Sequence, residues 1–140
     1  MTTSTLTAVD RLLDAFRAGH GVPAALFAPG AVLDATVPGW RFSVEGPDAV
    51  ARQYSGWFDL PCELEELERH PVEGGEVVTY LQSLVDQGVP YAAHHCHVLR
   101  FDAEGRIAGD LFFCGGRWDA ARLAEMAAAQ HAASVAARHA

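Results

Sequence analysis

The chain has 140 residues, half of them apolar and a fifth of them charged, and it carries a formal net charge of -8 at pH 7. This composition is too apolar for a disordered chain and fits a globular domain with one hydrophobic core. The acidic balance, without any cluster of lysine and arginine, excludes the charge pattern of a nucleic-acid-binding protein.

Neither a membrane segment nor a disulfide framework is indicated. No apolar run reaches membrane length, and the first residues lack the basic and then apolar pattern of a secretory signal. Three widely spaced cysteines without a CxxC pair, Cys62, Cys96 and Cys114, suggest neither paired disulfides nor a zinc ribbon. We therefore expect a cytoplasmic protein.

The first half of the chain predicts two helices and a strand. Apolar residues recur at helical spacing over residues 6–18, and Gly19 supplies a stop. Residues 23–29 are a broken apolar segment with at most a short helical turn, and the alternating run 31–37 predicts a strand. A second helix begins at Pro47, with Asp48 in its first turn, and ends near residues 59–61.

The second half predicts an antiparallel meander followed by a helix. Residues 62–71, 77–85, 91–101 and 106–114 are interpreted as four strands, the last two joined by the short loop 102–105. Residues 118–139 form an alanine-rich helix with a thin apolar face. We predict one α+β domain over residues 1–120, with a curved antiparallel sheet around a pocket, and a helical tail over residues 121–140.

The last hairpin brings a histidine and a carboxylate together. If Phe101 pairs with Arg106 across the loop, His97 lies directly opposite Asp110. Side chains so opposed have Cβ atoms about 5 Å apart, which is close enough to share a proton. A purely structural hydrogen bond in the sheet is the alternative, and a one-residue bulge would separate the pair.

Alternation divides this hairpin into two faces of different character. One mixes apolar and titratable groups, as a pocket for acid/base chemistry requires: Tyr91, His95, His97, Leu99, Asp110, Phe112 and Cys114. The other is largely apolar and predicts a homodimer through the outer side of the sheet: His94, Cys96, Val98, Ile107, Leu111 and Phe113. Asp34, within the first strand, either faces solvent or belongs to the site.

The order of elements resembles the nuclear transport factor 2-like superfamily over residues 6–120. The stretch "QGVPYAAHHCHVLRFDAEGRIAGDLFF" is similar to the closing hairpin of ketosteroid isomerases and SnoaL-like polyketide cyclases. The resemblance implies a cone-shaped curved antiparallel sheet wrapped around N-terminal helices.

Residue by residue, the resemblance favours the cyclases. His97 stands where ketosteroid isomerases keep a neutral carboxylic acid, Leu12 where they keep a phenol, and Ala35, beside Asp34, where they keep the general base. SnoaL-like cyclases pair a strand histidine with an acidic residue on the last strand, as His97 and Asp110 do. The alternating Asp and Arg of limonene-epoxide hydrolases is absent from "YLQSLV".

These observations predict an enzyme that needs no cofactor and moves a proton next to a carbonyl. The reaction is a cyclisation, isomerisation or dehydration of a small polyketide-like or terpenoid molecule. The catalytic candidates are His97, Asp110 and Asp34. The candidates for substrate binding are Trp40, Tyr54, Trp57, Tyr91, His95, Leu99, Phe112 and Cys114.

Two other functions are compatible with the sequence. His95, His97 and Asp110 resemble a facial triad of two histidines and one carboxylate for iron or zinc. A non-catalytic binding or dimeric assembly module is the other alternative. A pocket plugged by Phe112, Trp57 and Phe58 would favour assembly.

Overall fold

One six-stranded sheet organises the computed structural model, which describes residues 6–138. Its strand order is β2-β1-β6-β5-β4-β3, antiparallel throughout except that β1 and β6 run parallel. The strands are β1 (Phe27–Val37), β2 (Trp40–Glu45), β3 (Glu63–Val72), β4 (Gly75–Asp86), β5 (Val89–Phe101) and β6 (Ile107–Asp119). The helices are α1 (Ala8–Ala18), the short 3₁₀ helix η1 (Ala24–Leu26), α2 (Pro47–Trp57) and α3 (Ala120–Arg138).

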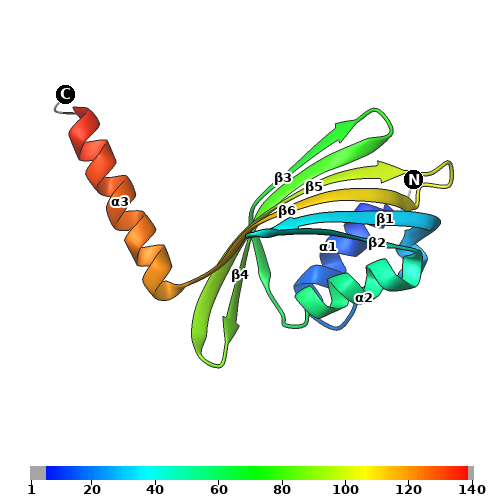
Figure 1. The fold of residues 1–140 in the computed structure, drawn as a ribbon, viewed down its shortest axis with the longest axis horizontal. Helices are drawn as coiled ribbons and strands as arrows, with labels where there is room; N and C mark the ends of the chain where they lie inside the picture. The colour runs from blue at the N-terminus through cyan, green and yellow to red at the C-terminus, as the bar shows by residue number, and fades with distance from the viewer. Residues whose placement is uncertain (1–5, 139–140) are drawn as a thin grey trace, which may run out of the picture.

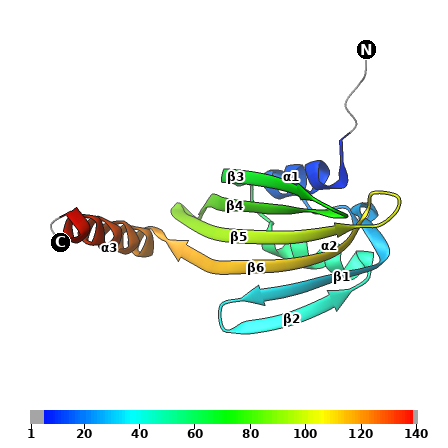
Figure 2. The ribbon, with the colours of Figure 1, turned by 90° about the horizontal axis from the view of Figure 1, so that it is seen from above.

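Helices α1 and α2 lie together on one face of the sheet (Figures 1 and 2). A capping box of Thr7 and Asp10 begins α1, and Gly19 ends it in the left-handed conformation at φ 70°. A Cβ atom on Gly19 would lie 2.3 Å from the backbone carbon of Leu60. Glycine therefore lets α1 pack tightly against the segment that leads into β3.

The core fills the space between these helices and the sheet. Phe16 of α1 stacks on Phe58 at 3.7 Å between ring centroids. Around this pair lie buried aliphatic and aromatic residues from both helices and from β1, β4, β5 and β6, which include Val9, Leu12, Leu13, Leu33, Val50, Tyr80, Leu99 and Phe112. The concave side of the sheet is thus largely apolar.

Most of the predicted elements are confirmed, with one omission. Both N-terminal helices, the four-strand meander and the final helix are present, although β1 begins earlier, at Phe27. The last strand also continues past residue 114 to Asp119, so the final helix begins at Ala120 rather than at Trp118. Strand β2 was not predicted, because its six residues form a half-exposed edge that pairs with β1 around the turn at Pro38 and Gly39. The predicted end of the last helix at His139 lies outside the described residues.

The register of the last hairpin differs from the prediction. His97 lies opposite Phe112, and Leu99 lies opposite Asp110. One residue of the shift arises because the strands close at Phe101 and Ile107, with Arg106 part of the loop. The other arises from a bulge between Phe101 and Arg100 in their pairing with β6. A shift of two residues keeps every side chain on its face, so the predicted pair still shares the concave side.

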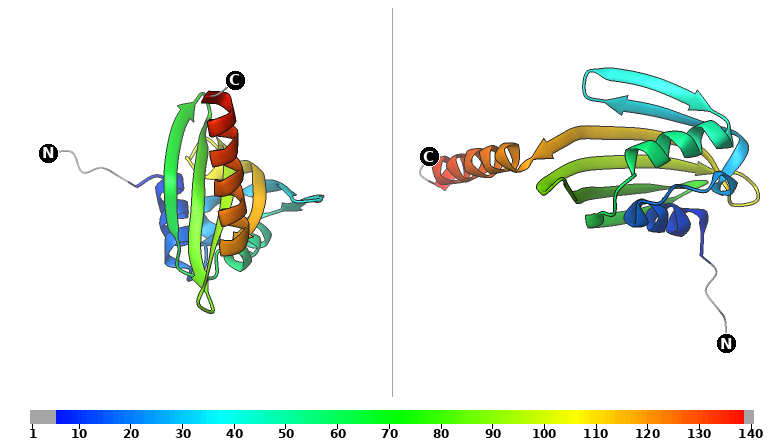
Figure 3. Two further views of the ribbon diagram at one scale, coloured as in Figure 1. Left: turned by 90° about the vertical axis from the view of Figure 1, so that its left-hand side faces the viewer. Right: turned by 90° about the horizontal axis from the view of Figure 1, so that it is seen from below.

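The outer face is apolar in part, as predicted. Leu111 and Phe113 are 37% and 42% exposed, whereas Ile107, predicted to lie beside them, is 1% exposed. The same bulge turns Ile107 to the concave side. Helix α3 extends from the end of β6 away from the sheet and has no buried residue (Figure 3). No described helix is long and apolar enough to cross a membrane.

Candidate functional site

Three titratable side chains face the helices from the β5–β6 hairpin. His95 and His97 are alternate residues of β5, and Asp110 comes from β6. They are 7%, 1% and 3% exposed. Burial of such groups is costly unless each polar atom finds a partner, so their hydrogen bonds define the site.

His97 and Asp110 belong to a buried chain of hydrogen bonds. The Nδ1 atom of His97 lies 2.7 Å from Oδ2 of Asp110, and its Nε2 atom lies 2.8 Å from the hydroxyl oxygen of Tyr80. Tyr54 of α2 donates its hydroxyl to the same Asp110 oxygen. Because a carboxylate only accepts, Nδ1 carries the proton, and in the neutral ring Nε2 then accepts from Tyr80. Both nitrogens of His97 are therefore occupied.

The two tyrosines act as donors at any ordinary pH. Burial, reinforced by the nearby Asp110 carboxylate, raises the pKa of both Tyr54 and Tyr80 well above 10.0. The chain Tyr80–His97–Asp110–Tyr54 thus ties β4, β5, β6 and α2 together beneath the helices. Oδ1 of Asp110 is buried without a hydrogen-bond partner among residues 6–138.

A cavity of about 250 Å³ lies beside this chain of hydrogen bonds. Its wall is formed by α2 and the segment after it, by β4, β5 and β6, and by the end of β1. The lining residues are Val37, Gly56, Trp57, Phe58, Asp59, Gln82, Ala93, His95, Phe112, Cys114 and Arg117. His97 and Asp110 do not line it. Phe112 does, and its ring centroid lies 4.6 Å from that of His97. The buried pair therefore lies behind an aromatic wall.

His95 is the histidine that lines the cavity. Its Nε2 atom lies 2.9 Å from Oε1 of Gln82, and because an amide oxygen only accepts, Nε2 carries the proton. Nδ1 is then an unprotonated acceptor, and it has no partner in the described part of the chain. Burial, together with the neighbouring His97 and His94, lowers the pKa of His95 to about 3. His95 is neutral at physiological pH, and its Nδ1 is a buried acceptor that forms no hydrogen bond with residues 6–138.

Comparison with solved structures identifies the fold of the chain. No family model and no curated protein matches the chain. Among solved structures, the NTF-2-like protein of unknown function from Burkholderia xenovorans LB400 has a TM-score of 0.58 at 15% identity, covering 77% of this chain and 80% of that one. The fold is that of ketosteroid isomerase-like, NTF-2-like proteins.

Two further structures with this ketosteroid isomerase-like fold are equally remote in sequence. A proposed ketosteroid isomerase from Parabacteroides distasonis ATCC 8503 has a TM-score of 0.54 at 12% identity, covering 75% of this chain and 83% of that one. A hypothetical protein from Catenulispora acidiphila DSM 44928, solved with trimethylamine, has a TM-score of 0.59 at 12% identity, covering 80% and 88%. The likeness confirms the expected fold.

Within this ketosteroid isomerase-like fold, the predicted site residues divide into three groups. Those on the cavity wall are Trp57, His95, Phe112 and Cys114. Those buried beside it are Tyr54, His97 and Asp110, in the hydrogen-bonded chain, and Leu99, in the core. Leu12 and Ala35, the counterparts of the isomerase phenol and base by resemblance, are fully buried core residues. The third group lies away from the cavity.

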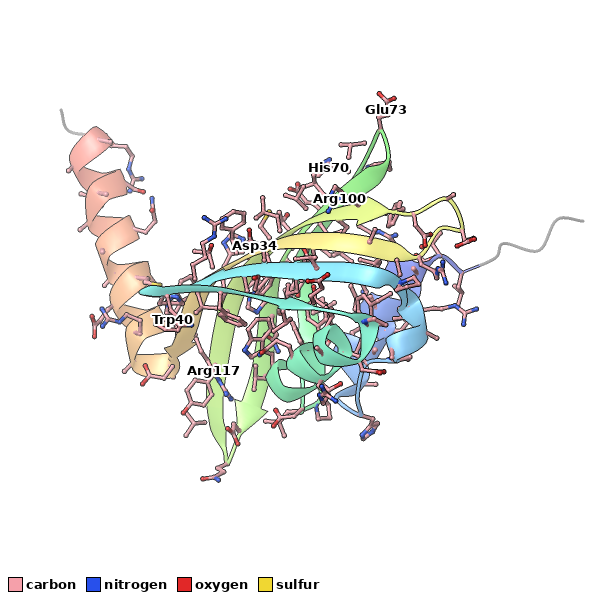
Figure 4. The ribbon with its side chains drawn as sticks, turned by 45° about the vertical axis from the view of Figure 1, so that its right-hand side comes forward. Asp34, Trp40, His70, Glu73, Arg100 and Arg117 are labelled. Atoms are coloured by element: carbon pink, nitrogen blue, oxygen red, sulfur yellow. The ribbon has the colours of Figure 1, made fainter. Side chains whose placement is uncertain are left out.

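Asp34, Trp40 and Tyr91 belong to that third group, because none of them lines the cavity. Asp34 lies on the outer face of β1, where Oδ2 accepts a hydrogen bond from Arg41 at 2.7 Å (Figure 4). This hydrogen bond lowers the pKa of Asp34. Trp40 begins the edge strand β2 and is 66% exposed. Tyr91 supports the guanidinium of Arg117, 4.4 Å above its ring.

The alternative metal triad is not supported by the geometry. Both nitrogens of His97 already bond Asp110 and Tyr80. Among residues 6–138, no three histidine, cysteine, aspartate or glutamate side chains converge as metal ligands would. Cys62, Cys96 and Cys114 are free thiols, and burial raises the pKa of each.

Sequence reasoning missed three residues of the site. Tyr80 and Gln82 are alternate residues of β4, and they lie opposite His95 and Ala93 of β5. Their alternation in "TYLQSL" was the available signal that both face the same side of the sheet. Arg117 lies beyond a bulge in β6, so regular alternation assigns it to the wrong face. The register of the β4–β5 hairpin, which closes at Asp86 and Val89, positions Tyr80 and Gln82.

Proposed function

We propose that the chain is a cofactor-independent acid/base enzyme that transfers a proton next to a carbonyl in a small, largely apolar molecule. One observation carries the proposal: on the wall of a cavity that mixes aromatic and polar side chains, His95 has one nitrogen held by Gln82 and the other buried and without a partner among residues 6–138. The cavity, about 250 Å³, lies below the usual range for drug-sized ligands. Its substrate is accordingly small.

His95 accepts the proton in this proposal. The C–H bond next to the carbonyl breaks, the proton moves to Nδ1 of His95, and the electron pair enters an enolate; the proton then returns to the same or another carbon. Isomerisation, dehydration and aldol-type cyclisation share this first step. The hydrogen bond from Nε2 to Gln82 holds the ring and leaves Nδ1 as the basic atom.

The His97–Asp110 pair takes a positioning role here, because neither residue lines the cavity and each is 1% exposed at its side chain. Phe112 lies against His97 and also faces the cavity. The pair and its two tyrosines hold this wall rigid. Direct proton transfer by His97 or Asp110, which the hairpin pattern predicts, requires the substrate to displace the ring of Phe112.

Deuterium incorporation into simple ketones tests the proposal, because it requires only the first proton transfer. Small cyclic ketones are incubated in D₂O with the protein, and loss of the α-proton signal is followed by NMR. We expect exchange above the buffer rate, reduced by about 10²- to 10⁴-fold in His95→Gln. His94→Gln is the matched control, because His94 is exposed on the other face of the same strand.

The same assay separates the two histidine roles. Direct catalysis by the buried pair predicts that folded His97→Gln and Asp110→Asn lose exchange while His95→Gln keeps it, which would contradict our proposal. A positioning role predicts a lower melting temperature with a smaller loss of exchange. Deuterium exchange that equals the buffer rate for every ketone tested would also contradict the proposed enzyme activity.

A non-catalytic ligand-binding module is the second candidate. It is favoured by the saturation of His97, whose ring nitrogens already bond Asp110 and Tyr80 and so offer nothing to a substrate. This candidate predicts that small apolar ligands shift the NMR signals of His95 without any exchange of their α-protons.

A further inference from the structure

Arg117 is the basic side chain that lines the cavity among residues 6–138. It reaches the cavity because of a local irregularity in β6. Cys114 pairs with His95, and Arg117 pairs with Ala93, so three steps along β6 match two along β5. The extra residue lies at Gly115–Gly116, where Gly116 has a φ of 116°. Without this bulge, Arg117 would point to the outer face.

A bulge that re-aims one side chain is typical of sheets next to binding sites. Here it brings a guanidinium to the same side as Ala93 and His95, both of which line the cavity. Gly116 has a backbone conformation that L side chains rarely adopt, so glycine permits the bulge. The interruption of the regular strand thus places one positive charge at the cavity.

Arg117 is held in place but remains accessible. Its guanidinium carbon lies 4.4 Å above the Tyr91 ring, and its Nη2 atom donates to Oδ2 of Asp86 at 3.2 Å. The two side chains of this ion pair are 46% and 40% exposed. An exposed ion pair contributes little to stability, so an anionic ligand can replace Asp86 at small cost. Tyr91 meanwhile keeps the guanidinium plane oriented.

The surroundings of Arg117 indicate which part of a ligand it contacts. It lines both the inner cavity and an open crevice of about 750 Å³ at the base of α3. The inner cavity presents Trp57, Phe58 and Phe112 to an apolar body. Asp59 is the acidic side chain on the inner wall, so a ligand with an amine is the competing possibility.

We propose that Arg117 binds a carboxylate on the substrate, which makes the ligand a small apolar carboxylic acid with its apolar body in the cavity and its carboxylate at the mouth. A guanidinium holds a carboxylate by two parallel hydrogen bonds and fixes its orientation. The inference rests on the proposed function in using the same cavity, but it concerns binding and needs no turnover.

Three probes with one ring test this inference: cyclohexanecarboxylate, cyclohexanecarboxamide and cyclohexylamine. Binding to the full chain is measured by NMR titration at pH 7. We expect the carboxylate to bind most tightly. Loss of one charge-assisted contact predicts about 10- to 100-fold weaker carboxylate binding in Arg117→Gln, with amide binding unchanged.

Arg100→Gln is the matched control, because it removes the same charge from the opposite face of the sheet, far from Arg117 (Figure 4). Its carboxylate affinity should equal that of the wild type. Arg117→Lys retains the charge but not the paired donors, and an intermediate affinity is expected. Circular dichroism verifies that each variant is folded.

Several outcomes overturn the inference. Tighter binding of the amine assigns the site to Asp59, and equal effects of Arg117→Gln on carboxylate and amide reduce Arg117 to a packing role. Absence of carboxylate binding by the wild type also rejects it. None of these results affects ketone exchange by His95, whereas failed exchange with intact carboxylate binding rejects the enzyme and retains the anion site.

Discussion

His95 and His97 lie two residues apart on the same face of β5, yet their surroundings differ in kind. His97 is saturated by Asp110 and Tyr80, and its side chain is 1% exposed. His95 lines the cavity, and its Nε2 atom is hydrogen-bonded to Gln82. Its Nδ1 atom has no hydrogen-bond partner among the residues that the structure describes. The same face of one strand thus holds a buried histidine with both ring nitrogens hydrogen-bonded and a second with one unpaired acceptor, and this contrast underlies the roles that we propose for them.

The strongest test of this contrast removes the carboxylate that bonds both His97 and Tyr54. Asp110→Ala leaves His97 and Tyr54 buried without their acceptor, and removing one partner of a buried pair costs about 3–5 kcal/mol. We expect the free energy of unfolding, measured by urea titration, to fall by that amount. Asp34→Ala is the control, since it breaks an exposed pair with Arg41. Equal losses in the two variants would contradict the structural role of the network.

The pH dependence of stability tests the incomplete histidine. His95 has a pKa of about 3 when folded and about 6.5 when unfolded, so between these values the unfolded chain binds the extra proton. Stability therefore falls as pH decreases from about 6.5 towards 3, by at most about 1.4 kcal/mol per pH unit from this residue. His95→Gln should flatten that acid limb, measured by thermal melts at each pH.

His94→Gln provides the comparison for this experiment, because His94 is exposed on the same strand. It should leave the acid limb as steep as in the wild type. If His95→Gln has no effect on the slope, His95 takes up its proton over the same pH range in the folded and unfolded chains, and burial does not hold the imidazole neutral.

The hydroxyl of Tyr80 tests the other end of the saturated chain with a smaller effect. Tyr80→Phe leaves Nε2 of His97 buried without a donor, which costs about 1–3 kcal/mol. Tyr91→Phe retains the ring under Arg117 and should change little. Chemical denaturation of both variants measures the difference, and equal midpoints would show that the Tyr80 hydrogen bond is dispensable.

The smallest expected effect on unfolding concerns the outer face, where a homodimer remains our prediction. Leu111 and Phe113 are exposed there, on the side of the sheet away from both histidines. Phe113→Ser should shift light-scattering mass from two chains towards one, with a change of at most about 0.5 kcal/mol in monomer stability. A wild-type monomer at micromolar concentration would contradict the dimer.

The pattern of the chain was sufficient to predict the α+β fold, the helices and the face on which His95, His97 and Asp110 lie. These depend on local signals: helical spacing up to Gly19, alternation along β5 and β6, and the turn after Phe101. Such signals act over a few residues and survive a register shift of two. The pair His97 and Asp110 was therefore found even though its predicted register was wrong.

Only the tertiary structure decided which of these residues meets the cavity. Tyr80 and Gln82 come from β4, which pairs with β5, and Tyr54 comes from α2. The hydrogen bonds of these side chains determine which histidine is saturated and which keeps a free acceptor among residues 6–138. The bulge at Gly115–Gly116 turns Arg117 inward, against the alternation of the strand. The sequence by itself determined what each segment forms and which way it faces, because those preferences are local. Partners and access depend on contacts between distant segments, which one strand does not encode.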